Sequence, residues 1–414
     1  MISKKAAIVG GIVIIVITTF FASFLTLQIS RYIDVQQGDR IIISKDDYLA
    51  NREFYQQIDK VKKDLTDSYL YPPDEETMMY GAIKGMVDSV ADDHTYFMDP
   101  ADFEEFTERS SSSYQGIGVV VQEDKDDGKI TIIQVYDGGP AAQAGIAVGD
   151  KIVAGGDMPV TAEEMDTAID MIKGISGTEV TISVERAEEV NEYTLERAYI
   201  EVPDLEYRMI GDDIGYIWLY EFDDVSAENF KDALDDLEAQ GMKGLMLDLR
   251  RNPGGYLHSC TEIADIFLPE GLIVTRVDRK GNEESVYSDK DSLGIPLVVL
   301  INEYSASASE LLSGAIQDYG VGTIVGTTSF GKGTVQTTRY YEEDGSALYF
   351  TIAHYLTPSG RNVNETGITP DIEVTVDEAA IEEYLAENPG EDLPPEMDNQ
   401  LQKGLEILKE KMGQ

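Results

Sequence analysis

The sequence predicts a multidomain protein with α+β and α/β parts: an apolar N-terminal helix, a helical segment, a region of short strands and an α/β core. Three observations predict this order. Apolar residues recur at helical spacing over residues 44–110, and short β-rich runs separated by turn residues occupy residues 111–198. Buried-type strands then alternate with amphipathic helices over residues 199–376, which favours an α/β core.

The composition excludes several classes of function. The chain carries 78 Asp+Glu against 32 Lys+Arg, a formal charge of −46, and a surface this acidic repels nucleic-acid phosphates. The single cysteine, Cys260, rules out a disulfide within the chain, and three histidines offer little for a histidine-based metal site. Residues 124–127 faintly resemble a calcium loop but lack its spacing. We therefore expect no nucleic-acid partner, no metal and no cofactor.

The N-terminus carries a candidate membrane anchor. Lys4 and Lys5 precede an uncharged apolar run over residues 6–29, which is long enough to span a bilayer. The lysines should stay cytoplasmic, which places the remainder of the chain outside the cell. A cleaved signal peptide is the alternative, but Ala22-Ser23-Phe24 is a poor cleavage site. We expect residues 1–30 to be an uncleaved single-pass anchor in the cell membrane.

The helical and strand-rich regions can be divided further. Two apolar faces in the helical region are expected to pack in the core: Phe54, Ile58, Val61 and Leu65, followed by Met79, Ile83, Met86, Val87 and Val90. In the next region we expect strands at residues 117–122, 129–136 and 179–185, a helix at 163–173, and a hairpin turn at Asp127-Gly128.

The core elements are predicted in the same way. Strands are expected at residues 215–220, 243–250, 297–301, 323–326, 334–341 and 347–355. Helices are expected at 226–240, with Ser226 as a cap, at 258–268 and at 305–319. Residues 377–414 form an acidic linker and a C-terminal helix at 397–412. This helix could dock on its own chain or on a second subunit, which leaves room for a homo-oligomer through the terminal segments.

A cluster of small hydroxyl residues marks a candidate nucleophile. Ser305, Ser307 and Ser309 alternate with alanines between a predicted strand and a predicted helix. Alanine leaves room for a substrate carbonyl, and N–H groups at a helix start can stabilise negative charge. The alternative is that the serines only cap the helix, which we expect of Ser305 in any case.

Lys332 is the candidate base. A lysine can deprotonate serine only when neutral, and lowering its pKa from about 10.4 to 7–8 costs roughly 3.5–4.5 kcal/mol. Lys332 has no acidic residue within five positions on either side, so its surroundings favour such a shift. Gln336, four residues later, would share a face with Lys332 on an extended strand and could orient it without holding its charge.

Two further motifs need interpretation. Ser329 and Lys332 fit the S-x-x-K string of penicillin-recognising enzymes, but the companion motifs are missing and two glycines flank the lysine.

The loop over residues 247–255 follows a buried-type strand. It could aim the N–H of Gly254 or Gly255 into a cleft beside the N–H of Ala308 to hold an oxyanion, or it could be an ordinary turn.

Several motifs in one order resemble the carboxy-terminal processing proteases, also called tail-specific proteases. The resemblance covers residues 80–371. The matching segments are an N-terminal helical signature (81–86) and its following turn (92–95), a PDZ carboxylate loop (114–118), further PDZ segments (139–141, 149–150), an oxyanion loop (248–255) and two catalytic segments (305–310, 330–336).

The resemblance implies a PDZ domain, residues 111–198, inserted beside a protease core of the Clp–crotonase type, residues 199–376 with 70–110. It implies Ser307 as the nucleophile, Lys332 as the general base and Gln336 as the orienting residue. The implied oxyanion donors are the N–H groups of Ala308 and Gly254, with Gly255 as the alternative.

It also implies an endopeptidase that selects proteins by apolar C-termini. The substrate terminus would add to the PDZ edge strand, with its carboxylate on the loop formed by Gln115, Gly116, Ile117 and Gly118. Ile117, Val119 and Val121 could shape that pocket or fill the core. Lys173 stands where relatives often carry an arginine that couples PDZ binding to activation, and lysine lacks the planar fork. The rival function is a non-catalytic, membrane-tethered PDZ module on a protease-like scaffold.

Overall fold

A computed structural model describes residues 45–71, 73–109, 113–125, 127–289, 292–376 and 394–414, together with 381 and 384. The chain divides into two compact units, residues 1–83 and residues 84–414. The predicted anchor, residues 1–30, and most of the predicted acidic linker lie outside the described residues. None of the helices within those ranges combines the length and the apolar character that crossing a bilayer requires.

The helical region contains α2 (Lys45–Ser68), α3 (Glu75–Asp88) and α4 (Pro100–Arg109), with the short strand β1 (Tyr96–Met98) before α4. The prediction that its apolar faces are buried is wrong for most positions. The side chains of Phe54, Ile58, Val61 and Leu65 are exposed, as are those of Met79, Met86 and Val90, whereas Val87 is buried. Helical spacing aligns these side chains, but burial also needs an element packed on that face.

The predicted PDZ region forms a sheet in the order β3-β4-β5-β7-β8, with β6 beside β5 and a separate β2–β9 pair. Its elements are β2 (Ser113–Gly116), β3 (Val119–Glu123), β4 (Ile130–Val135), α5 (Pro140–Gln143), β5 (Lys151–Gly155), β6 (Met158–Pro159), α6 (Met165–Ile172), β7 (Glu179–Arg186), β8 (Glu189–Glu196) and β9 (Ala198–Glu201). The hairpin turn predicted at Asp127-Gly128 joins β3 and β4. Ile117 and Val119 are buried in the core of this region, and Val121 packs against it, as core-filling residues would.

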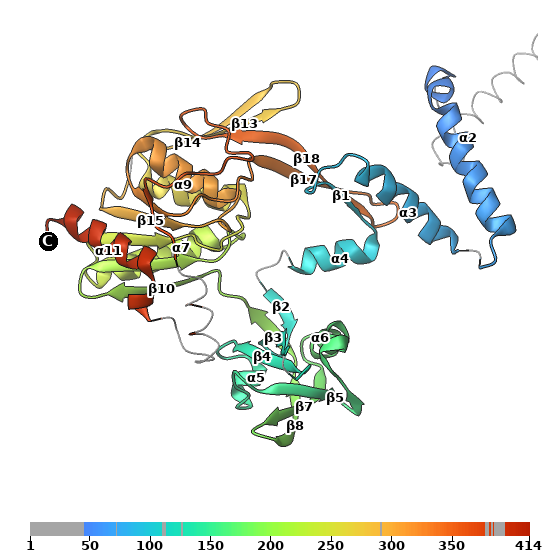
Figure 1. Ribbon diagram of the computed structural model, residues 1–414, viewed down its shortest axis with the longest axis horizontal. Coiled ribbons are helices and arrows are strands. Elements are labelled where there is room, and N and C mark those ends of the chain that lie inside the picture. The colour runs from blue at the N-terminus through green and yellow to red at the C-terminus, as the bar shows by residue number, and fades with distance from the viewer. Residues whose placement is uncertain are drawn as a thin grey trace, which may run out of the picture. The chain divides into compact units, whose positions relative to one another are not determined.

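A six-stranded sheet forms the α/β core, in the order β10-β11-β12-β15-β16-β19 (Figure 1). All neighbours are parallel except the β10–β11 pair. The elements are β10 (Leu205–Ile210), β11 (Ile214–Leu219), α7 (Ser226–Ala239), β12 (Gly244–Asp248), α8 (Leu257–Phe267), β15 (Leu297–Ile301), α9 (Ala308–Tyr319), β16 (Thr323–Gly326), β19 (Ile372–Glu373) and α11 (Asn399–Met412).

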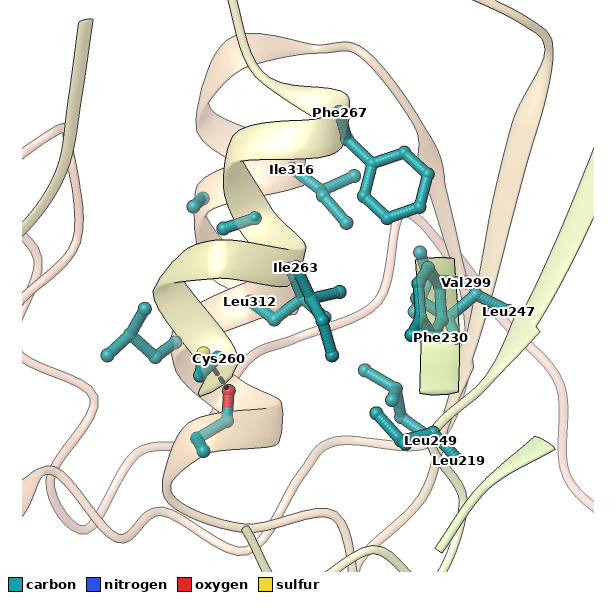
Figure 2. Packing of buried hydrophobic residues seen from close by; sticks show 14 of the residues in the cluster. Leu219, Phe230, Leu247, Leu249, Cys260, Ile263, Phe267, Val299, Leu312 and Ile316 are labelled. Carbon is teal, nitrogen blue, oxygen red and sulfur yellow. Dashed lines mark hydrogen bonds between the residues drawn. The ribbon is translucent and has the colours of Figure 1, made fainter. Parts of the chain in front are cut away.

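The sheet is buried on both faces, which explains why its strands are apolar without alternation. On β12, Leu245 and Leu247 face one core cluster and Met246 faces another, as the two-residue period of a strand requires. Figure 2 shows the first cluster, where Phe230 of α7, Ile263 of α8 and side chains of α9 pack against the strands. Cys260 lies in this cluster, and its thiol donates to the carbonyl oxygen of Ala308 at 3.2 Å.

Helix α11 covers the opposite face of the sheet. Leu401, Ile407 and Leu408 are buried against strands β11, β12, β15 and β16. The N-cap residue Asp398 also accepts a hydrogen bond from the partly buried Arg250 at 2.9 Å. The helix therefore docks on its own chain, and a second subunit is not needed to cover its apolar face.

A second, antiparallel sheet has the order β1-β18-β13-β14, with β17 also paired to β18. It contains β13 (Gly271–Asp278), β14 (Glu283–Ser288), β17 (Thr334–Tyr340) and β18 (Ala347–Leu356). The β13–β14 hairpin was not predicted from the sequence. Strand β1 pairs with β18 in the register Tyr96↔Tyr349, so the turn that precedes β1 is held next to β18.

Two predicted caps differ in the structure. Helix α7 begins at Ser226 with Val225 as its N-cap, and the Ser226 hydroxyl accepts the N–H of Asp223 at 2.8 Å. Helix α9 begins at Ala308, and its N-cap is Ser307. Ser305 is buried outside the helix, where its hydroxyl donates to Leu249 O at 2.8 Å. Both serines satisfy loop N–H or carbonyl groups, so capping preference alone misplaces them.

The docking of α11 can be tested by removing one buried side chain. Leu408 is fully buried, so Leu408→Ala should lower the free energy of unfolding by about 2–5 kcal/mol through lost burial and a cavity. Urea unfolding followed by the fluorescence of Trp218, the only tryptophan, measures this. The neighbouring exposed Lys409→Ala should change stability by no more than about 0.5 kcal/mol. Equal stability of the two variants would contradict the docking.

Candidate active site

The turn between β15 and α9 presents one accessible serine. Ser305 and Ser309 are fully buried, whereas Ser307 is partly exposed. The Ser309 hydroxyl donates to the carbonyl oxygen of Asn252 at 3.0 Å, and that of Ser305 is also bonded. Ser307 has φ 55° and ψ −112°, a strained conformation for a residue other than glycine, of the kind concentrated at functional sites. Burial and backbone geometry thus distinguish Ser307 from its neighbours.

The carboxylate of Glu310 joins this turn to the segment that carries Lys332. Glu310 is fully buried. Its Oε2 accepts the N–H of Ser307 and the N–H of Lys332, each at 2.8 Å. Its Oε1 accepts the Gly331 N–H and the Ser329 hydroxyl, each at 2.6 Å. All four partners donate, so the group acts as a carboxylate whose burial is compensated by hydrogen bonds.

Tyr355 on β18 holds the same two residues from their carbonyl groups. Its hydroxyl lies 2.8 Å from the carbonyl oxygen of Ser307 and 2.5 Å from that of Lys332. The ring is almost fully buried, and this burial raises the pKa of the phenol far above its ordinary value. Tyr355 therefore stays a neutral donor. Glu310 thus binds the N–H groups of both Ser307 and Lys332, and the carbonyl oxygens of these two residues share the single phenol proton of Tyr355.

Lys332 is half-buried before strand β17. Burial lowers the pKa of its ammonium group, and the negative charges of Asp92 and Glu310 oppose this effect. The neighbourhood is therefore not free of acid as the sequence suggested, because chain folding brings in two distant carboxylates. Among the residues that the structure describes, none forms an ion pair with Lys332 Nζ, and the net pKa is lowered.

Gln336 is held differently from the prediction. Lys332 lies outside β17, and a register shift between Val335 and Gln336 interrupts the strand alternation, so the four-residue spacing does not by itself place the two side chains on one face. The Gln336 amide Nε2 donates to the hydroxyls of Thr334 at 2.8 Å and Thr351 at 3.1 Å. Gln336 is thus fixed by two threonines.

The glycine loop after β12 lies against the serine turn. Gly254 has φ +106°, and a Cβ atom placed on it would lie 2.8 Å from Ser307 Cβ and 2.9 Å from Ala308 N, so only glycine fits there. The N–H of Gly254 is already donated to Asn252 Oδ1 at 2.9 Å. Within the described chain, no acceptor receives the N–H of Ala308 or of Gly255. The geometry favours Gly255 over Gly254 as the second oxyanion donor.

Asn252 fixes this loop. It is fully buried, and its Nδ2 donates to Leu219 O at 2.9 Å. Its carbonyl oxygen accepts the N–H of Ala306 at 3.0 Å and the Ser309 hydroxyl. The predicted oxyanion loop and the predicted nucleophile turn are therefore bonded to each other directly.

The predicted carboxylate loop lies between β2 and β3. The N–H group of Ile117 has no backbone acceptor among the described residues, the backbone of Gly118 is hydrogen-bonded to the Tyr114 phenol, and β3 is an edge strand of its sheet. The Ile117 N–H and the edge strand suit a peptide that adds to β3 with its terminal carboxylate on the loop. The side-chain oxygen of Gln115 accepts the Ser176 N–H at 2.7 Å, which fixes the start of the loop.

Three residues of the site were missed in the sequence: Glu310, Tyr355 and Asn252. Glu310 had a local signal, since Ser307 and Glu310 have the spacing of a capping box. Asn252 stands in the glycine loop, where an amide is a common turn residue. Tyr355 had no local signal, because its two partners come from segments that pair only in the folded chain.

Comparison with known proteins agrees with this architecture. Residues 213–374 match the model of peptidase family S41, and residues 106–185 match the PDZ domain model. The carboxy-terminal processing protease CtpA of Bacillus subtilis (strain 168) is 32% identical over 375 residues, which are 90% of this chain and 78% of the relative. A protein named as a CtpA-like serine protease in Staphylococcus aureus (strain COL) is 33% identical over 322 residues, 77% of this chain and 64% of the relative.

A solved S41-family structure from Bacteroides fragilis NCTC 9343 matches with a TM-score of 0.52 at 18% identity. It covers 86% of this chain and 97% of that chain, and it supports the fold alone. The fold and the family matches define a serine peptidase with a PDZ domain. The chain belongs to peptidase family S41, and within that family it is a carboxy-terminal processing protease.

The role of Glu310 can be tested with its isosteric amide. Glu310→Gln replaces one acceptor oxygen by an NH₂ group, which leaves two donors without an acceptor. We expect a loss of about 2–5 kcal/mol in the free energy of unfolding and a large fall in kcat, measured by urea unfolding and peptide cleavage. The same change at the exposed Glu262 is the control. A Glu310→Gln variant as stable and as active as the parent would contradict the clamp.

Proposed function

We propose that the chain is a membrane-anchored, extracytoplasmic serine endopeptidase in which Ser307 is the nucleophile and Lys332 the general base. One observation carries the proposal: the side chains of Glu310 and Tyr355 bind the backbone of both Ser307 and Lys332. Two segments that are distant in the sequence are thereby held at a fixed separation. A serine and a lysine held this way suit proton transfer, because general-base catalysis depends on mutual geometry.

The reaction follows from the chemistry of these groups. Neutral Lys332 takes the proton of the Ser307 hydroxyl as its oxygen attacks the scissile carbonyl carbon. The N–H groups of Ala308 and Gly255 receive the negative charge that develops on the carbonyl oxygen, with Gly254 bracing the loop. Protonated Lys332 then gives its proton to the leaving amine, and water hydrolyses the resulting ester in a second round of the same steps. Gln336 orients Lys332 as a neutral group and therefore does not hold it charged.

Substrates are proteins or peptides with apolar C-termini that bind the PDZ domain. The exposed edge of β3 supplies main-chain hydrogen bonds, and loop N–H groups such as that of Ile117 would hold the terminal carboxylate. The PDZ match at residues 106–185 supports peptide binding. Because Ile117 and Val119 are buried in the core, preference for apolar termini must come from other residues near β3.

The localisation completes the proposal. Lys4 and Lys5 followed by an uncharged run over residues 6–29 support a single-pass anchor in the cell membrane, with the catalytic part outside the cytoplasm. The protein would then act on exported or membrane-bound substrates.

The proposed roles make a direct mutational prediction. Ser307→Ala and Lys332→Ala should each lower kcat/KM by a factor on the order of 10³ or more, because neither attack nor proton transfer has a substitute. Cleavage of an unfolded protein with an apolar tail measures this. The exposed residues Ser292 and Lys280 provide matched alanine controls that should retain activity. If Ser307→Ala and Lys332→Ala cleave at the parent rate, Ser307 and Lys332 are not the nucleophile and base. If the parent itself does not cleave, the non-catalytic PDZ module is the better description.

Substrate selection by the C-terminus makes a second prediction. Amidation of the terminal carboxylate removes the charge that would accept the loop N–H groups, so kcat/KM should fall about 10–100-fold, the value of a hydrogen bond to a charged group. The same peptide acetylated at its N-terminus is the control and should be cleaved as before. Equal rates for the amidated and the free-acid peptide would argue against carboxylate recognition.

A further inference from the structure

The turn over residues 92–95, between α3 and β1, has no role in the mechanism above. The carboxylate of Asp92 accepts the N–H of His94 at 3.0 Å and the hydroxyl of Thr95 at 2.7 Å. The Thr95 hydroxyl in turn accepts the N–H of Thr351 at 3.1 Å. The turn is thus bonded to strand β18 at Thr351, the residue that also accepts a hydrogen bond from Gln336.

Thr351 connects Asp92 to Gln336. The Thr95 hydroxyl is bonded to the Asp92 carboxylate and to the Thr351 N–H, and the Thr351 hydroxyl accepts the Nε2 amide of Gln336 at 3.1 Å. The Thr351 side chain also lowers the pKa of Asp92, as a hydroxyl that donates to the carboxylate would. A hydroxyl has one proton and two lone pairs, so it can donate to the carboxylate and accept from the amide at once. A carboxylate cannot donate, so the Thr351 hydroxyl gives its proton to Asp92. The hydroxyl can then only accept from Gln336, and the NH₂ end of the amide faces Thr351.

Asp92 is also one of the charged groups around Lys332. The carboxylates of Asp92 and Glu310 favour the charged form of Lys332, and burial together with the positive charge of Lys332 lowers the pKa of His94. The carboxylate of Glu310 already accepts four hydrogen bonds. Partial burial opposes the ionisation of Asp92, but hydrogen bonds from Thr95, Thr351 and the His94 N–H lower its pKa overall. It is therefore ionised at neutral pH.

We propose that Asp92 is a positioning residue of this active site: through Thr95 and Thr351 it orients the amide of Gln336, and its negative charge acts on Lys332. The inference rests on the proposed function, in which Lys332 is the base. It adds a fourth segment, from the helical region, to the serine turn, the lysine segment and the glycine loop.

The two effects of Asp92 have separate signatures in the pH profile of kcat/KM. Since neutral Lys332 is the active form, kcat/KM should rise with slope near one on the acid side and level off above the pKa of Lys332. Asp92 raises that pKa, so its charge should set the position of the acid limb. The orientation of Gln336 should instead set the height of the plateau.

The test compares three variants of the full chain. Asp92→Asn keeps the shape and removes the charge, so the acid limb should move to lower pH by about one unit. Asp93→Asn removes the same charge from the exposed neighbour and should leave the limb in place. Thr351→Val breaks the link to Gln336 but keeps the charge of Asp92, so the plateau should fall about tenfold with the limb unmoved.

A control separates the two groups that could titrate. His94→Gln removes the imidazole, and the limb should persist if it belongs to Lys332. Urea midpoints within error of the parent would show that the fold is intact. Coincident limbs for Asp92→Asn, Asp93→Asn and the parent would overturn the charge effect, and an unchanged plateau in Thr351→Val would overturn the link to Gln336. A fully active Lys332→Ala would instead defeat the proposed function itself.

Discussion

The buried carboxylate of Glu310 is the interaction on which the site depends. A charged group without partners in the interior would cost several kcal/mol, and four donors offset that cost only when all are present together. Those donors come from the serine turn and from the segment over residues 329–332. The carboxylate therefore stabilises one arrangement of the two segments, and Tyr355 reinforces it from the carbonyl side. The strained backbone of Ser307 persists because its N–H and C=O groups are both bound.

The topology of the sheet explains why these segments meet. Strands β12, β15 and β16 are parallel neighbours, so the loops after them emerge at the same edge, where open α/β sheets place their sites. The glycine loop, the serine turn and the lysine segment are these three loops in order. Hydrogen bonds from side chains then need only to fix how neighbouring loops contact each other. Asn252 fixes the glycine loop, and its carbonyl oxygen binds the Ser309 hydroxyl of the serine turn. Tyr355 extends this order to the antiparallel sheet, since it contacts the site from β18.

The sequence predicted those features that local pattern determines. The strands at residues 297–301 and 323–326 were placed correctly, because a strand buried on both faces is an apolar run bounded by turn residues. The apolar face of α2 was predicted to be buried and is exposed, since periodicity reports alignment and not the presence of a facing layer. The surroundings of Lys332 were misjudged for a related reason: Asp92 and Glu310 are distant in the sequence and adjacent in the fold. Likewise Gly254 was preferred to Gly255 because the sequence does not show that Asn252 occupies its N–H.

Because the chain is so acidic, it matters that burial lowers the pKa of Lys332 more than the nearby carboxylates raise it. The chain has a formal charge of −46, and several lysines among the described residues have a carboxylate partner. At Lys84 and Lys151 such partners raise the pKa of the ammonium group. Lys332 Nζ forms no ion pair with Glu310, whose oxygens accept four hydrogen bonds: one from the Lys332 N–H and three from other donors. Asp92 is likewise occupied by Thr95, Thr351 and His94 N–H. Hydrogen bonding therefore lets two acids stand near the lysine as fixed charges without pairing with its ammonium group. Burial can then lower its pKa against them, which is the condition that a lysine base in so acidic a protein must meet.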